Sequence, residues 1–119
     1  MADYIDGFVF PIPRERLDEY KRLAARVSDI WKEHGAKEYR EYAGDDMTLA
    51  GTRSFTDNVA KGDEEVVIFG WVAFDSREAR DLANKKVAED PRMEELMGTF
   101  DTGFDASRMF YGGFKSFSQ

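Results

Sequence analysis

The segment that most constrains this chain is residues 65–74, E-V-V-I-F-G-W-V-A-F, because it has no polar face when it is read as a strand. Successive side chains of a strand point to opposite faces of its sheet. One face would carry Val66, Ile68, Gly70, Val72 and Phe74, and the other Val67, Phe69, Trp71 and Ala73. A strand that is apolar on both faces must be covered on both.

The helices of so short a chain suffice to cover only one side of a sheet. With 119 residues, the chain is expected to fold as a single domain over residues 1–119. Something else must then cover the second apolar face. We therefore predict a homodimer in which two copies pair through their sheet faces.

The first half of the chain reads as strand, helix and strand. Residues 4–12 are rich in aromatic and branched side chains, which favours a strand. Over residues 14–34 apolar side chains recur at spacings of three and four, and Gly35 follows, which predicts a helix with a glycine at its end. Residues 36–42 alternate again and predict a second strand.

Between the halves lies the least readable segment, residues 43–63, which fits either a hairpin or a single helical turn. After the apolar strand, Asp75 and Glu78 have the spacing of a capping box and predict the start of a second helix. This helix is expected to end at Asp90, because the residue before a proline resists the helical conformation. Its expected buried face consists of Ala79, Leu82, Ala83 and Val87.

The last elements are shorter. Residues 92–97 predict one more helical turn that ends at Gly98, and residues 99–106 predict a loop. Residues 109–117 predict a final strand, in which Gly112 and Gly113 indicate a close backbone approach or a bulge.

The order strand–helix–strand thus occurs twice. Two such units make a ferredoxin-like plait (βαββαβ), an α+β fold with a four-stranded antiparallel sheet and helices on one face. Its other face is open. Two copies packed sheet to sheet would cover this face and form a dimeric α/β barrel.

Several separated motifs resemble one protein family. They are D-G-F-V at residues 6–9, W-K-E-H-G-A at 31–36, E-Y-R-E at 38–41, D-P-R-M at 90–93 and R-M-F-Y-G-G-F-K at 108–115. Together they are similar to a family of small bacterial proteins of unknown function, some described as RNA signal recognition particle-like. The resemblance implies the dimeric α/β-barrel superfamily, which includes cofactor-independent monooxygenases, haem-degrading enzymes and muconolactone isomerases. It implies no catalytic residue.

Composition narrows the range of partners. The net charge of −7 disfavours nucleic acid and anionic membranes, because phosphate binding needs a basic surface. Basic positions such as Arg77 and Arg80 alternate with acids and are expected on solvated helix faces. With no cysteine and one histidine, we expect no metal and no cofactor. Neither a signal peptide nor an apolar run of about 20 residues is present, so we expect a cytoplasmic protein.

Three polar residues are candidates for catalysis. Asp6 lies in an aromatic strand, so it is either a general base or one half of a structural ion pair. His34 could transfer protons or ligate haem, or it could cap the helix before Gly35. Arg40 could hold a substrate carboxylate, or it could pair with Asp6, with Glu41 or across a dimer seam.

Two aromatic residues are candidates for ligand binding. Trp71 and Tyr111 could line a pocket for a planar molecule, or they could fill the core. Three functions are then open. The protein binds a small apolar or aromatic molecule with no assigned reaction; it is a cofactor-independent monooxygenase or isomerase, in which Asp6 takes a proton and Arg40 or His34 stabilises the anion; or it is a structural interaction module.

Overall fold

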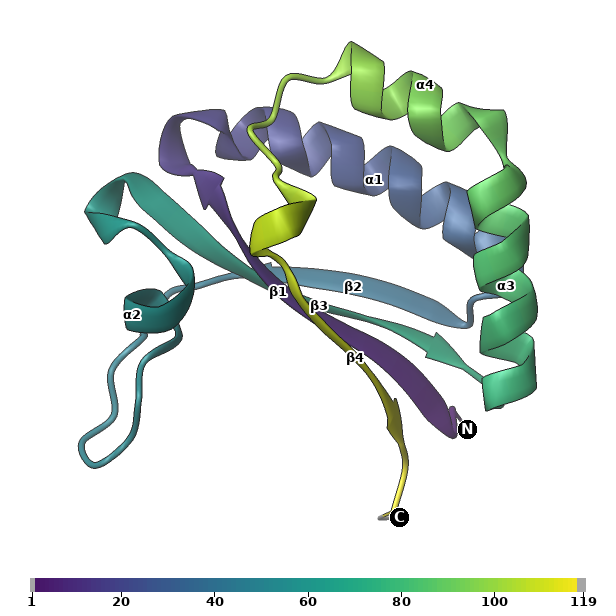
Figure 1. Cartoon of the computed structure of the whole chain (residues 1–119), viewed down its shortest axis with the longest axis horizontal. Coiled ribbons are helices and arrows are strands. Elements are labelled where there is room, and N and C mark those ends of the chain that lie inside the picture. The colour runs from purple at the N-terminus through teal and green to yellow at the C-terminus, as the bar shows by residue number, and fades with distance from the viewer. Residues whose placement is uncertain (1, 118–119) are drawn as a thin grey trace.

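The computed structural model describes residues 2–117 and contains a four-stranded antiparallel sheet with helices packed on it (Figure 1). The strands are β1 (Tyr4–Pro13), β2 (Glu38–Ala43), β3 (Glu65–Phe74) and β4 (Phe110–Lys115). Their order in the sheet is β2-β3-β1-β4, which is the ferredoxin-like arrangement. The predicted α+β fold is therefore confirmed.

The register of the sheet explains the glycine pair near the C-terminus. β1 and β4 pair without interruption from Tyr4 opposite Lys115 to Val9 opposite Phe110, so the strand has no bulge. A Cβ atom added to Gly113 would collide with the hydroxyl oxygen of Tyr4. The close approach is therefore real, and it lets the Tyr4 ring lie against the β4 backbone.

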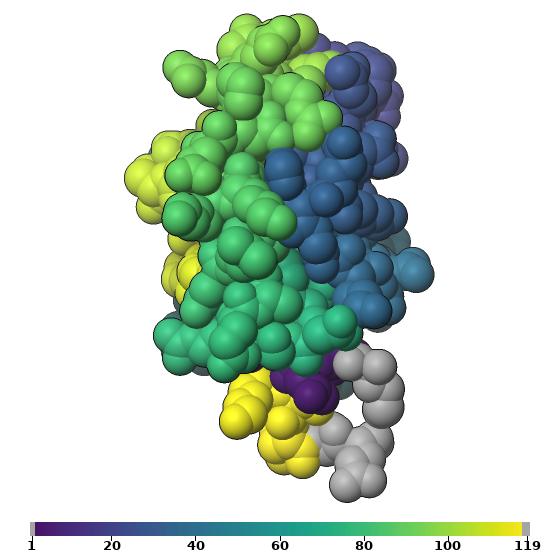
Figure 2. All heavy atoms as spheres, turned by 90° about the vertical axis from the view of Figure 1, so that its right-hand side faces the viewer, coloured from purple at the N-terminus to yellow at the C-terminus, as the bar shows by residue number. Residues whose placement is uncertain are grey.

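Three helices cover one face of the sheet. They are α1 (Leu17–Glu33), which follows a 3-10 turn at Arg14–Arg16, α3 (Arg77–Glu89) and α4 (Pro91–Thr99). Gly35 has φ of 116°, as a glycine that follows a helix end commonly does. Figure 2 shows α3 and α4 beside α1 on one side of the molecule. Within residues 2–117, no helix is long and apolar enough to cross a membrane.

The start of α3 and the bounds of α4 differ from the expectation. The N-cap of α3 is Ser76, whose hydroxyl accepts a hydrogen bond from the Ala79 amide at 3.1 Å, so the predicted cap at Asp75 is wrong by one residue. α4 begins directly at Pro91 and continues through Gly98, because a proline is well tolerated in the first turn and a single glycine only weakens a helix.

The buried face of α3 is also rotated from the predicted one. Ala83 and Val87 are buried, but Leu82 is 53% exposed, so it does not belong to the core. Arg80 and Asn84 lie on the inward side instead, since residues three and four apart share one face of a helix. The inward face of α3 is therefore partly polar.

The connection at residues 43–63 contains a helical turn, one of the two alternatives. This turn is α2 (Phe55–Val59), followed by a 3-10 turn at Gly62–Glu64. α2 lies on the sheet face opposite α1 and α3 (Figure 1), and the Phe55 ring is 6.1 Å from the Phe69 ring. It covers only one end of that face, on which Phe110 and Phe114 remain 59% and 57% exposed.

Candidate functional site

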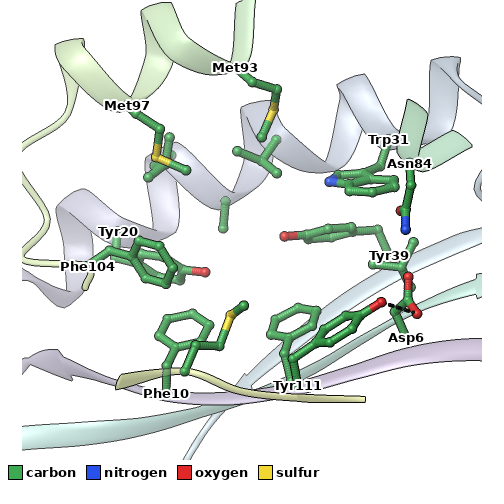
Figure 3. A pocket seen from close by; sticks show the side chains of 16 residues that line it. Asp6, Phe10, Tyr20, Trp31, Tyr39, Asn84, Met93, Met97, Phe104 and Tyr111 are labelled. Carbon is green, nitrogen blue, oxygen red and sulfur yellow. Dashed lines mark hydrogen bonds between the residues drawn. The ribbon is translucent and has the colours of Figure 1, made fainter. Parts of the chain in front are cut away.

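A cavity of about 320 Å³ lies between the sheet and the helices (Figure 3). All four strands contribute to its floor, and α1, α3, α4 and the segment before β4 enclose the rest. The lining residues are Asp6, Phe8, Phe10, Tyr20, Leu23, Ala24, Val27, Trp31, Tyr39, Val72, Asn84, Met93, Met97, Phe104, Met109 and Tyr111. Its volume falls at the lower end of the range of about 300–1,000 Å³ for small-molecule pockets.

Aromatic and methionine side chains form most of the cavity wall. The Phe10 ring packs edge to face on Tyr20 and on Phe104, with centroid distances of 5.5 and 5.0 Å. Met93 and Met97 reach in from α4 (Figure 3). Rigid rings beside flexible methionines make a wall that can adapt to an apolar ligand.

The polar end of the cavity is built around Asp6, which is 4% exposed. Its Oδ1 oxygen accepts a hydrogen bond from the Tyr111 hydroxyl at 2.7 Å and another from Nη1 of Arg80 at 3.0 Å. Arg80 also donates to the hydroxyl oxygen of Tyr4 at 3.0 Å, and its guanidinium carbon lies 4.9 Å from the centre of that ring. The carboxylate of Asp6 on β1 thus connects β1 to Arg80 on α3 and to Tyr111 on β4.

Burial raises the pKa of Asp6 above its usual value, although the Tyr111 hydrogen bond and the Arg80 charge act in the opposite direction. Burial, together with the neighbouring Asp6, raises the pKa of Tyr111 to about 12. The tyrosine therefore stays protonated at neutral pH and donates to the carboxylate. Such an arrangement can accept a proton or orient a polar group of a ligand.

A second carboxylate, Glu41, is half-buried and lies behind the cavity wall. Glu41 on β2 accepts hydrogen bonds from the hydroxyl groups of Tyr20 and Tyr39, the latter at 2.8 Å. Burial raises the pKa of Glu41, and the two tyrosine hydrogen bonds oppose the rise. Because Tyr20 and Tyr39 also line the cavity, Glu41 fixes the position of two wall residues without touching the cavity itself.

The structure brings together Asp6 and Tyr111, two of the five residues singled out in the sequence. Trp71 and Arg40 lie on the open face of the sheet. Trp71 stacks on Tyr42 at a centroid distance of 5.3 Å. Arg40 pairs with Glu38, with 3.0 Å between Nε and Oε2, so it does not pair with Asp6 or Glu41.

His34 lies at the end of α1, outside the lining of the cavity. Its Nε2 atom is 2.7 Å from Oδ2 of Asp90, and Oδ1 of the same aspartate accepts a hydrogen bond from the Arg92 amide at the start of α4. Hydrogen bonds from Arg92 and His34 lower the pKa of Asp90. His34 therefore joins α1 to the beginning of α4.

The sequence reading missed Arg80 and Asn84. Arg80 was expected on a solvated face, but its side chain is only 11% exposed and forms the ion pair with Asp6. The available signal was spacing, because Arg80, Ala83, Asn84 and Val87 recur at intervals of three and four. Among residues 2–117, no group of three or more histidine and carboxylate side chains is arranged to hold a metal ion.

Residues 3–106 match a family model described as "Protein of unknown function (DUF1428)". The protein named "Uncharacterized protein YbaA" of Escherichia coli strain K12 is 38% identical over 113 residues, which cover 95% of each chain. The protein of the same name from Shigella flexneri matches to the same extent. A match over nearly the whole length of both the chain and its relatives shows that this protein belongs to the DUF1428 family.

Proposed function

We propose that this protein binds a small apolar or aromatic molecule in the cavity between the sheet and the helices. The observation that carries the proposal is the composition of the wall, in which aromatic and methionine side chains surround a single buried carboxylate, Asp6. An apolar enclosure with a few convergent polar groups is the usual form of a small-molecule site.

The test is calorimetric titration of the protein with 2-naphthol, a planar probe of two fused rings. We expect saturable binding to the unaltered protein. The variant Ala24→Phe adds a ring to the cavity wall and is expected to abolish it. Ala88→Phe, at an exposed position of α3, is the matched control and should bind as the unaltered protein does. Binding that survives Ala24→Phe would contradict the location.

A proton-transfer reaction is the second candidate function, and the raised pKa of Asp6 favours it. Asp6 would take a proton from a carbon next to a carbonyl and return it to another carbon, as in an isomerase. Arg80 would keep the carboxylate in place through its ion pair, which differs from the role of anion stabiliser expected of Arg40 or His34. A monooxygenase would in addition need molecular oxygen as co-reactant. Asp6-dependent incorporation of solvent deuterium into an enolisable ligand tests the proton transfer.

We also propose that two copies pair through the open sheet face and form a dimeric α/β barrel. The support is a cluster of exposed aromatic side chains on one face of the sheet, including Phe69, Phe110 and Phe114, which are 43%, 59% and 57% exposed. An exposed apolar patch of this kind marks an interaction surface. The face is the second apolar side of β3, which α2 covers at one end only (Figure 1).

Light scattering coupled to gel filtration tests the pairing. The unaltered protein is expected to elute as a dimer and Phe114→Glu as a monomer, because a buried unpaired charge is strongly unfavourable. Leu82→Glu is the matched control, since Leu82 is 53% exposed on α3, away from this face. An unaltered protein that is monomeric at micromolar concentration would remove the proposal.

A further inference from the structure

The two oxygens of Asp6 are used unequally. Oδ1 accepts both the Tyr111 and the Arg80 hydrogen bonds, whereas no residue within the described range donates one to Oδ2. The Asp6 side chain is only 5% exposed, and it lines the cavity. A carboxylate oxygen can accept two hydrogen bonds, so Oδ2 has unused acceptor capacity. A ligand that supplies a donor would satisfy it.

Trp31 offers the complementary group. It lies in the same half of the cavity as Asp6, with its ring nitrogen turned toward the middle (Figure 3). Among the described residues, 2–117, none accepts a hydrogen bond from this indole N–H. The Trp31 ring is itself fixed by edge-to-face packing on Phe74, with centroids 6.2 Å apart. The cavity thus holds one unused acceptor and one unused donor.

Charge limits which ligands can use these groups. Arg80 does not line the cavity, so a bound molecule meets the carboxylate and not the guanidinium. An anionic ligand would place a like charge beside a buried carboxylate. A cationic ligand would bring a second positive charge to an Asp6 that Arg80 already neutralises, inside an apolar enclosure. A neutral head group avoids both costs.

We propose that the cavity selects neutral planar molecules that carry a hydroxyl or N–H donor, which hydrogen-bonds to Oδ2 of Asp6 while an acceptor on the same molecule faces Trp31. The body of the molecule packs among the aromatic and methionine side chains. This selectivity rests on the function proposed above, because it requires that the cavity be the binding site.

Three planar probes of nearly equal size separate the possibilities by calorimetry at pH 7. 2-Naphthol is neutral and carries a donor, 2-methoxynaphthalene is neutral and lacks one, and 2-naphthoate is an anion. We expect 2-naphthol to bind at least about tenfold more tightly than 2-methoxynaphthalene, as is typical for a hydrogen bond to a charged acceptor. 2-Naphthoate is expected to bind more weakly than either neutral probe.

Each outcome has a distinct meaning. Equal affinity for the two neutral probes would overturn the selectivity and leave the binding function in place. Tightest binding of 2-naphthoate would also overturn it, because the cavity would then recognise anions. If none of the three probes binds, the proposed function itself fails, and the inference fails with it.

Two variants locate the donor preference. Asp6→Asn is expected to abolish the preference of about tenfold or more for 2-naphthol over 2-methoxynaphthalene. Asp81→Asn is the matched control, since Asp81 also contacts Arg80, with 3.0 Å between Nε and Oδ1, but lies outside the cavity. Its preference should equal that of the unaltered protein. The probe comparison on the unaltered protein decides the question even where Asp6→Asn does not fold.

Discussion

Asp6 and Glu41 are carboxylates on the same sheet face, and the protein satisfies them in different ways. Asp6 has a cation, Arg80, and a single phenol donor, both at one oxygen. Glu41 has two phenol donors, one at each oxygen, and forms no ion pair within the described residues. Burial raises the pKa of both groups.

The difference distinguishes a carboxylate with unused hydrogen-bonding capacity from one whose two oxygens are both occupied. Glu41 uses both of its oxygens to hold Tyr20 and Tyr39, and none of its atoms lines the cavity. Asp6 lines the cavity, and both of its hydrogen bonds from described residues go to Oδ1, which leaves Oδ2 without a donor among them. A binding group needs free hydrogen-bonding capacity, so Asp6 is the candidate and Glu41 the support.

The largest effect is expected from removing the cation of Asp6. Arg80→Met should lower the free energy of unfolding by about 3–5 kcal/mol, because it leaves a buried carboxylate without its partner. Urea denaturation at pH 7 measures the loss. The control is Arg77→Met on the same helix, whose side chain is 70% exposed. It should stay within about 0.5 kcal/mol of the unaltered protein.

The double variant Asp6→Asn/Arg80→Met sharpens this result. Removing both partners of a buried pair leaves no uncompensated charge, so the double variant should be more stable than Arg80→Met alone. A loss below about 1 kcal/mol for Arg80→Met would mean that Asp6 is solvated or protonated and that the ion pair contributes little.

A smaller effect is expected at Glu41. Tyr39→Phe removes one hydroxyl donor and leaves Oε2 of Glu41 without a partner, which should cost about 1–3 kcal/mol of unfolding free energy. Tyr42→Phe on the same strand is the matched control, because Tyr42 is 49% exposed on the open face. If both substitutions have the same effect, the Glu41 hydrogen bonds do not stabilise the fold.

From the sequence, the place of Asp6 in the sheet could be predicted, but its ion-pair partner could not. The period of two along β3 identified its second apolar face, and the same period along β1 puts Asp6 on one face with Phe8 and Phe10. Both inferences depend on local geometry only. The fold followed from the order of these elements.

The partner of Asp6 and the orientation of α3 depend on contacts between segments that are distant in the sequence. Arg80 meets Asp6 across 74 positions of sequence, and no local pattern specifies that approach. The helix face was misassigned because Leu82 was judged by its hydrophobicity, whereas the orientation of α3 is set by small residues such as Ala83 that pack closely on the sheet. Pairing with Asp6 was one of the alternatives open for Arg40, but strand alternation places Arg40 on the opposite face of the sheet, beside Trp71.

The smallest expected effect is on the pH dependence of the unfolding free energy, and it again distinguishes Glu41 from Asp6. Because the folded pKa of Glu41 is raised, the folded state holds a proton that the unfolded state has lost, between the usual value of 4.5 and the raised one. Unfolding free energy therefore falls as pH rises through this window, with a slope of at most about 1.4 kcal/mol per pH unit for one group. Glu41→Gln should make the fall shallower, as urea midpoints at successive pH values would show.

Asp6 also makes the unfolding free energy fall as pH rises, because its pKa is raised too. The pH range in which this happens depends on the charge of Arg80. In a folded Arg80→Met variant, or in the milder Arg80→Lys, the loss or displacement of the cation should move the Asp6 window to higher pH. The Glu41 window should not move, since the causes of its shift are burial and the two tyrosines alone. Carboxyl ¹³C titrations of the two residues measure this directly. A joint displacement of both windows would show that the two carboxylates are coupled through the cavity wall and do not act independently.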